Sequence, residues 1–236
     1  MNNMQETNFV LLWQEHYQKI ERALHINEIL LRDSINTKAR NSMRRLYRIK
    51  TVGIVAGIIF LGLLGIGLFF ALKNYQSNKL YFIISIGAIF LINLKAVYDY
   101  IKHLHWASEI DYDGKIITIQ QKLTQIKLSI INHCRIMVLQ LPFWSTFFLD
   151  GSWFPFSTPA GFLVFQIFIT GLLAVLSIWA FNNLKPEYAN RFWIKQLLAG
   201  AGGNSVSKTL QLYQELKDFE LPENPTTREN HGPENS

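Results

Sequence analysis

Long apolar runs alternate with polar segments along this chain, and the lengths of the runs predict membrane-spanning helices. A helix needs about 20 residues to cross about 30 Å of hydrocarbon. Four runs reach that length, at residues 51–72, 80–98, 130–149 and 160–181. The first and fourth runs contain no charged residue, whereas the second contains Lys95 and the third Arg135. The pattern predicts an all-α membrane protein with four transmembrane helices and amphipathic cytoplasmic helices that extend from the bundle.

The polar segments carry a second pattern, in which apolar side chains recur every three or four residues and therefore share one face of a helix. In residues 1–50 this stripe comprises Val10, Trp13, Tyr17, Ile20, Leu24 and Leu31, with the spacing of a short coiled coil interrupted at Asn27. Further stripes are Tyr112, Ile116, Ile119, Leu123, Ile126 and Ile130, and then Val206, Leu210, Tyr213 and Leu216. Each stripe either packs inside the chain or docks another protein.

These patterns divide the chain into four parts. Residues 1–50 form an amphipathic cytoplasmic helix and a basic anchor, and residues 51–181 form the transmembrane region with a cytoplasmic helical connection over 99–130. Residues 182–220 form an interfacial segment and a cytoplasmic helix. The tail over 221–236 has almost no apolar content and is expected to be disordered.

Lysine and arginine are distributed unevenly about the four runs. Nine lie in the first fifty residues, six between Lys95 and Arg135 and six after Phe181, against only Lys73 and Lys79 in the other two connections. Because positive residues stay on the cytoplasmic side, the protein is expected to cross the membrane several times with both termini cytoplasmic. The predicted membrane anchor comprises Arg40, Arg44, Arg45, Arg48 and Lys50. This topology explains the net charge of +6, so nucleic-acid binding is not predicted.

Few polar side chains interrupt the apolar runs. Lys95 needs a partner inside the membrane, and Asp99, one helical turn later, is placed to supply it. Asn93, Gln140 and Gln166 have the character of interhelical hydrogen-bonding positions. An alternative hypothesis is that Lys95 and its polar neighbours line a transport path.

Two further features bear on helix packing. Gly53 and Gly57 are four residues apart in the first run, a spacing that permits close approach of another helix, either of this chain or of a second copy. Pro142 is expected to bend the third span.

The sequence offers little catalytic chemistry. His103 and His105 are two residues apart, which places them on opposite sides of a regular helix and prevents them from sharing a metal ion. No nucleophile with its base, zinc-binding spacing or nucleotide fingerprint is present in the sequence. A non-enzymatic protein without a metal or cofactor is therefore expected.

Four segments carry a resemblance to a known family: "LWQEHYQKIERALHINEILL" at 12–31, "EIDY" at 109–112, "LQLPFWSTFF" at 139–148 and "RFWIKQLL" at 191–198. Together they resemble an uncharacterised family of small bacterial four-span membrane proteins, over most of the chain up to about residue 220. The resemblance implies an integral protein of the bacterial inner membrane. It brings no catalytic or binding residues with it.

The sequence therefore favours a membrane protein whose cytoplasmic helices form a module for self-association or for docking a cytoplasmic regulatory protein. The residues expected to form that docking stripe are Trp13, Tyr17, Ile20, Leu24 and Leu31. The alternative is a subunit of a small transporter or channel, in which Asn93, Lys95, Asp99 and Gln140 line a path.

Overall fold

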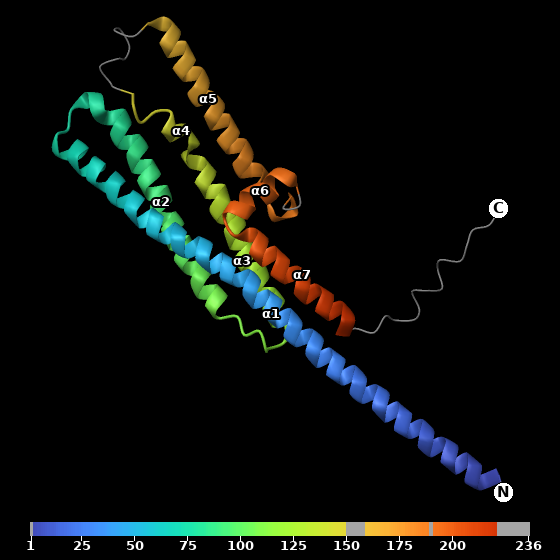
Figure 1. The fold of residues 1–236 in the computed structure, drawn as a ribbon. Helices are drawn as coiled ribbons and strands as arrows, with labels where there is room; N and C mark the ends of the chain where they lie inside the picture. The colour runs from blue at the N-terminus through green and yellow to red at the C-terminus, as the bar shows by residue number, and fades with distance from the viewer. Residues whose placement is uncertain (1, 150–158, 189–190, 221–236) are drawn as a thin grey trace, which may run out of the picture.

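The computed structural model describes residues 2–149, 159–188 and 191–220, and all regular structure in these ranges is helical (Figure 1). The α-helices are α1 (Asn2–Lys73), α2 (Leu80–Ser108), α3 (Ile116–Met137), α4 (Leu141–Trp144), α5 (Ala160–Asn183), α6 (Phe192–Gly200) and α7 (Gly203–Glu220). Short 3-10 turns are η1 (Ser77–Lys79), η2 (Val138–Gln140) and η4 (Pro186–Tyr188). The predicted disordered tail lies outside the described residues.

Three helices in the described part of the chain are long and apolar enough to cross a membrane: α1 as Leu12–Lys73, α2 and α5. Most of their apolar side chains are exposed in this single chain, as expected for surfaces that face lipid tails. The all-helical prediction is confirmed, and with it the first, second and fourth apolar runs as helices of spanning length. The first apolar run has no helix of its own, because α1 continues without a break from Asn2 through residue 50 to Lys73.

The third apolar run differs from the prediction of one continuous helix over 130–149. Helix α3 ends at Met137, the 3-10 turn η2 follows, and α4 covers only Leu141–Trp144. Pro142 stands at the start of α4, where its missing N–H costs no hydrogen bond. The proline therefore lies at a break between helices and not within a bent one.

The apolar segments pack in the order α1, α2, α4 and α5, with η2 also lying against α5 (Figure 1). Glycines allow α1 to approach α2 closely: a Cβ atom at Gly57 would lie 2.7 Å from Val97, and one at Gly53 would lie closer still to the Tyr100 ring. The close packing predicted for this glycine pair therefore takes place within the chain.

Below the apolar segments, four helices enclose one hydrophobic core. Residues 31–50 of α1 pack on α2 and α7, and α3 packs on the same two helices. The core includes Ile35, Ala39, Met43 and Leu46 of α1, Ala107 of α2, Ile119, Leu123, Ile126 and Ile130 of α3, and Val206, Tyr213 and Leu216 of α7. Helix α6 adds Ile194 and Leu198 to this core. We call this unit the bundle.

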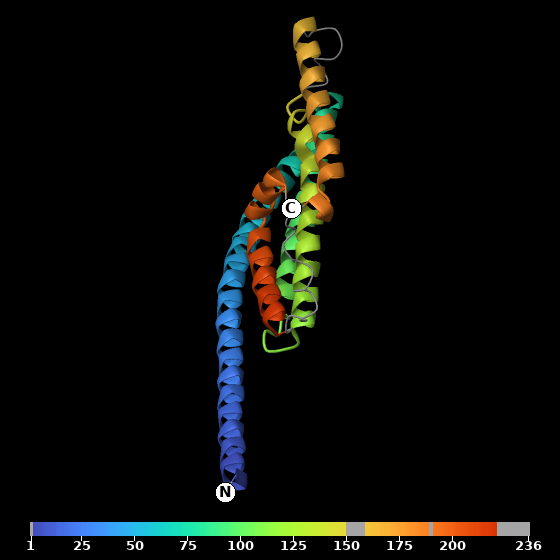
Figure 2. The same cartoon turned by 90° about the vertical axis from the view of Figure 1, so that its right-hand side faces the viewer.

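Residues 2–30 of α1 extend alone beyond the ends of α2, α3 and α7 in both views (Figure 2). We call this segment the arm. Every side chain from Leu12 to Leu30 is exposed. From Leu12 to Leu30 the arm therefore leaves its apolar side chains in contact with solvent, although the rest of α1 below the apolar segments is packed.

Candidate functional site

The predicted docking stripe lies on the arm and is exposed over most of its length. Trp13 is 63% exposed and Leu24 is 59% exposed, and Tyr17 and Ile20 are similar. The Trp13 and Tyr17 rings stack with their centroids 5.9 Å apart. Leu31 is different, because it is half-buried against the edge of the bundle core. The structure thus groups the first four residues on a free helix face and places Leu31 where that face enters the bundle.

The other two stripes pack inside the chain. Ile119, Leu123, Ile126 and Ile130 meet Val206, Tyr213 and Leu216 in the bundle core. The Tyr213 hydroxyl donates to Oδ1 of Asn36 at 2.7 Å. Burial raises the pKa of Tyr213 above its ordinary range and raises the pKa of Tyr112 to about 12. Of the three stripes, only the one on the arm lacks cover within the described part of the chain.

The predicted basic anchor residues separate into two environments. Arg40 lies 3.3 Å from Asp113 and 5.4 Å from the Tyr112 ring centroid, and Arg44, Arg45 and Arg48 are exposed. Lys50, in contrast, is 0% exposed. It therefore does not reach the surface in this chain. The structure corrects the prediction that Lys50 belongs to a surface anchor.

Lys50 lies in a buried cluster of polar side chains where the bundle meets the apolar segments. Its Nζ atom lies 4.0 Å from the Tyr100 ring centroid, in a cation–π arrangement. Neither this Nζ atom nor Nδ1 of His103 has a hydrogen-bond partner among the described residues. Nε2 of His103 lies 2.9 Å from the Ser129 hydroxyl.

Asp99 connects this cluster to α3. Its Oδ2 atom accepts from Nζ of Lys95 at 2.5 Å and lies 3.2 Å from Nδ1 of His133. The Lys95 and Asp99 pair is the one that their spacing predicts. The contact with His133 was not predicted, because it depends on the packing of α2 against α3. No group of three His, Cys, Asp or Glu side chains suited to a metal ion occurs in the part of the chain that the structure describes.

The remaining predicted polar residues connect helices within the apolar segments. Nδ2 of Asn93 donates to Oε1 of Gln140 at 3.0 Å, and Nε2 of Gln166 donates to the Ser145 carbonyl at 2.5 Å. The hydroxyls of Ser85 and Thr146 lie 2.8 Å apart. These contacts join α2 to the η2–α4 region, and that region to α5. They satisfy buried polar groups that would otherwise be costly in an apolar environment.

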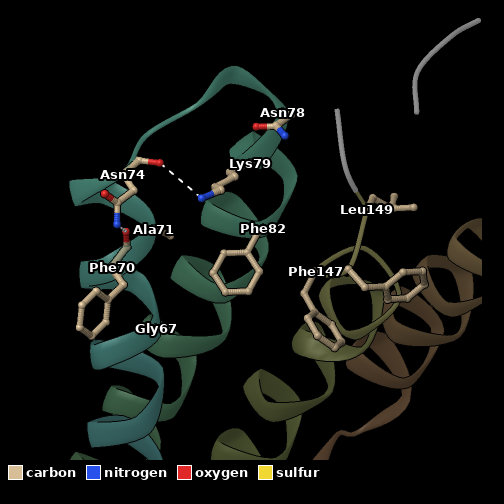
Figure 3. A pocket seen from close by; sticks show the side chains of 10 residues that line it. Gly67, Phe70, Ala71, Asn74, Asn78, Lys79, Phe82, Phe147 and Leu149 are labelled. Carbon is tan, nitrogen blue, oxygen red and sulfur yellow. Dashed lines mark hydrogen bonds between the residues drawn. The ribbon is translucent and has the colours of Figure 1, made fainter. Parts of the chain in front are cut away.

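A pocket of about 420 Å³ opens at the end of the α1–α2 hairpin farthest from the bundle. Figure 3 shows Phe70, Asn74, Lys79 and Phe82 on the α1–α2 hairpin and Phe147 across from them on the segment after α4, with the Lys79 ammonium directed at the Asn74 carbonyl.

Comparison with known proteins gives no support from relatives: no family model, no curated protein and no solved structure matches the chain. The resemblance to the four-span bacterial family therefore stays a prediction. What the fold defines is the class: a helical protein that has, in its described residues, three helices of membrane-spanning length and an exposed amphipathic arm.

Proposed function

We propose that this is a non-enzymatic, multi-pass protein of the bacterial inner membrane that associates with a second copy of itself through the arm. The observation that carries the proposal is the exposed stripe of Trp13, Tyr17, Ile20 and Leu24. Exposed apolar surface of this extent on a helix favours a partner that covers it.

The proposed topology has four crossings with both termini in the cytoplasm. The distribution of lysine and arginine supports it, with 21 of 23 on one side of the proposed membrane: nine before Thr51, six from Lys95 to Arg135 and six after Phe181. The third crossing would be made by the broken segment from α3 through η2 and α4. Its position between α2 and α5 supports this, because irregular backbone at membrane depth is tolerated where other helices cover it.

The stripe on the arm continues a face that already packs. Eighteen residues make five full helical turns. Trp13 and Leu31, which are eighteen residues apart, therefore lie on the same face of α1, as do Tyr17 and Ile35. Leu31 and Ile35 both contact the bundle core. The arm therefore extends a packing surface past the point where the helices of its own chain end.

The sequence of the arm fits a parallel copy of itself. Trp13, Ile20 and Asn27 recur every seven residues, as do Tyr17, Leu24 and Leu31, which is the repeat of a two-stranded coiled coil. Two copies in one membrane project their arms in the same direction, so their pairing is parallel. A polar residue such as Asn27 in the seam then fixes the register.

The charges beside the seam favour the same arrangement. In a parallel pair, Glu21 of one arm flanks the seam next to His16 of the other, so no two carboxylates meet there. An antiparallel pair would instead bring the Glu21 and Glu28 positions of the two arms together, which is repulsive. The membrane and the charges therefore select the same orientation.

Cysteine cross-linking in membranes tests the pairing directly. In a Cys134→Ala background, Leu24→Cys is expected to give a disulfide-linked dimer on mild oxidation, because Leu24 lies in the seam. Arg22→Cys is the matched control, since residue 22 lies on the outer face of the same turn and is expected to stay monomeric.

The molar mass of the full chain in mild detergent provides a second readout. The wild-type protein is expected to be dimeric, Leu24→Glu monomeric, and the outer-face variant Gln18→Glu dimeric. A wild-type monomer, or equal cross-linking of both cysteine variants, would overturn self-association. Loss of a different bound protein on removal of residues 1–30 would also overturn it, in favour of a cytoplasmic regulatory partner.

A transporter or channel subunit is the second candidate, and the polar contacts of α2 support it. Asn93 with Gln140, and Lys95 with Asp99, follow one another along α2. Solute flux into proteoliposomes that is lost in Lys95→Ala would establish this role. Flux equal to that of empty liposomes for the wild-type protein would exclude it for the solutes tested.

A further inference from the structure

A second surface of the molecule, separate from the arm and from the Asp99 cluster, is a basic pocket between α1 and α7. Its volume is about 500 Å³. The residues that line it are Lys38, Asn41, Ser42 and Arg45 of α1 with Asn204, Ser205 and Lys208 of α7. The lining thus contains three cations, two amides and two hydroxyl groups, and no carboxylate.

The pocket is built by regular structure and not by mobile surface side chains alone. Asn41, Ser42 and Arg45 follow Lys38 by three, four and seven positions, so the four residues share one face of α1. The Ser42 hydroxyl donates to the Ser205 carbonyl at 3.0 Å and joins the two helices at the pocket. Ser205 is buried. The three cations are therefore presented by a fixed pair of helices.

The cations of the pocket have no counter-charge among the described residues. No ion pair involves Lys38, Arg45 or Lys208 in the described part of the chain. The sequence itself contains no Asp or Glu between Asp33 and Asp99, or between Glu187 and Glu215. Both walls of the pocket thus come from segments free of acidic residues. Like charges held this close repel one another unless an anion neutralises them.

We infer that this pocket binds a phosphoryl group, carried either by an anionic lipid or by a soluble phosphate compound. Arginine and lysine with amide and hydroxyl donors are the groups that bind phosphate oxygens. The pocket also opens on the first turn of α7, where the helix dipole favours an anion. The charge of the lining and the absence of acidic neighbours carry the inference, and the dipole adds to them.

The position of the pocket along α1 leaves both sources open. Arg45 stands six residues before Thr51, which is about 9 Å along the helix from the first apolar run. The head-group region beside about 30 Å of hydrocarbon is several ångströms thick on each side, so a lipid phosphate lies within reach of Arg45. Lys38 is two turns farther from the apolar run, where a soluble phosphate compound has free access.

Calorimetric titration of the full-length protein in neutral detergent, at constant ionic strength, separates the two sources. One titration uses inorganic pyrophosphate. The other titration uses dihexanoyl phosphatidylglycerol below its micelle concentration, with dihexanoyl phosphatidylcholine as the neutral reference. Binding of pyrophosphate identifies a site that soluble phosphate compounds fill, whereas binding of phosphatidylglycerol alone identifies a lipid site.

Matched triple variants test whether the pocket itself is responsible. Lys38→Gln, Arg45→Gln and Lys208→Gln together are expected to weaken binding of the active probe at least tenfold. The control combines Arg44→Gln, Arg48→Gln and Lys195→Gln, which remove the same charge from exposed positions outside the pocket and are expected to change binding less than twofold.

Thermal unfolding in a chloride buffer, without pyrophosphate or added lipid, checks that both triple variants are folded. Equal weakening by the two triples would overturn the inference, because it would show attraction to net charge. Binding of neither probe to the wild-type protein would overturn it as well, as would equal binding of phosphatidylcholine and phosphatidylglycerol. The result is independent of arm pairing, since the pocket lies within one chain.

Discussion

The Lys50 ammonium lies 4.0 Å from the centroid of the Tyr100 ring and is fully buried, without a hydrogen-bond partner among the described residues. A cation–π contact stabilises such a pair by about 0.5 to 2 kcal/mol. Removing a charge from water costs more than this unless hydrogen bonds or a counter-charge compensate. Burial of the Lys50 ammonium therefore lowers the stability of the folded protein.

Replacement of Lys50 by methionine is expected to raise the stability of the protein. The methionine side chain fills a similar volume and removes the buried charge, so the gain is expected to be about 1 kcal/mol or more. Thermal unfolding in detergent measures it, with Arg48→Met at an exposed position as the control for lost charge. A midpoint several degrees lower in Lys50→Met would show that a counter-charge, such as the Asp99 carboxylate, compensates the ammonium.

Asp99 and Asp113 provide a comparison between a buried and an exposed ion pair. Asp99 contacts Lys95 and His133 and its side chain is 6% exposed, whereas Asp113 contacts Arg40 with 75% of its side chain exposed. Asp99→Asn is expected to cost about 1 to 3 kcal/mol in the free energy of unfolding, because buried partners lose their charge-assisted hydrogen bonds. Asp113→Asn is expected to cost less than about 1 kcal/mol.

Denaturant titration of the two variants in the same detergent measures this difference. Asp113→Asn controls for the chemistry of the substitution, since both variants change one carboxylate to an amide. Similar losses from the two variants would mean that the buried contacts of Asp99 contribute no more to stability than the exposed contact of Asp113.

Features that arise within a single helix can be predicted from this sequence, whereas contacts between two helices cannot. The apolar runs are visible because the membrane sets a length, and the Lys95 and Asp99 pair is visible because the two residues are one turn apart on a single helix. The contact of Asp99 with His133 is not visible, since it requires two helices to meet. The break after Met137 was not predicted: Pro142 was expected to bend a continuous span, but a proline marks where a helix starts as readily as where one bends.

Lys50 was assigned to the surface because it ends a basic run. A signal for its burial nevertheless exists: Ala39, Met43, Leu46 and Lys50 are three or four residues apart, so Lys50 continues the buried face of α1. The arm presents the opposite case. Its stripe was identified correctly as one face of a helix, but periodicity alone does not decide whether another helix of the same chain covers that face.

Gly202 is a position where the backbone requires glycine. Its φ is +86°, and a Cβ atom there would lie 2.5 Å from Cδ1 of Leu46 in the bundle core. Gly202→Ala is therefore expected to destabilise the protein by about 1 to 3 kcal/mol. The matched control is Gly200→Ala at the end of α6, where a Cβ atom meets nothing within 4 Å.

The control at Gly200 is expected to be neutral or slightly stabilising, because alanine favours the helix. Thermal unfolding of both variants measures the contrast between residues two positions apart. Equal midpoints for the two variants would show that the α6–α7 turn relaxes without disturbing Leu46.

The bundle is expected to lose stability in alkaline solution through its buried tyrosines. The ordinary tyrosine pKa is 10.0, and burial raises that of Tyr112 to about 12 and that of Tyr213 above its usual range. A phenol with a raised pKa in the folded state stabilises the fold fully below pH 10. This contribution is lost as the pH rises from 10 through the folded-state pKa, because the unfolded chain releases its proton first.

Unfolding midpoints measured between pH 9 and pH 12 test this expectation. Tyr213→Phe is expected to lower stability at pH 8 by about 1 kcal/mol, because Oδ1 of Asn36 loses its donor, and to flatten the decline above pH 10. Tyr75 is 57% exposed, so Tyr75→Phe is expected to leave the slope unchanged. It is the control for the Tyr→Phe substitution, because the lysines titrate alike in both variants. If Tyr213→Phe and the wild-type protein declined with the same slope, ionisation of the bundle tyrosines would not drive alkaline unfolding.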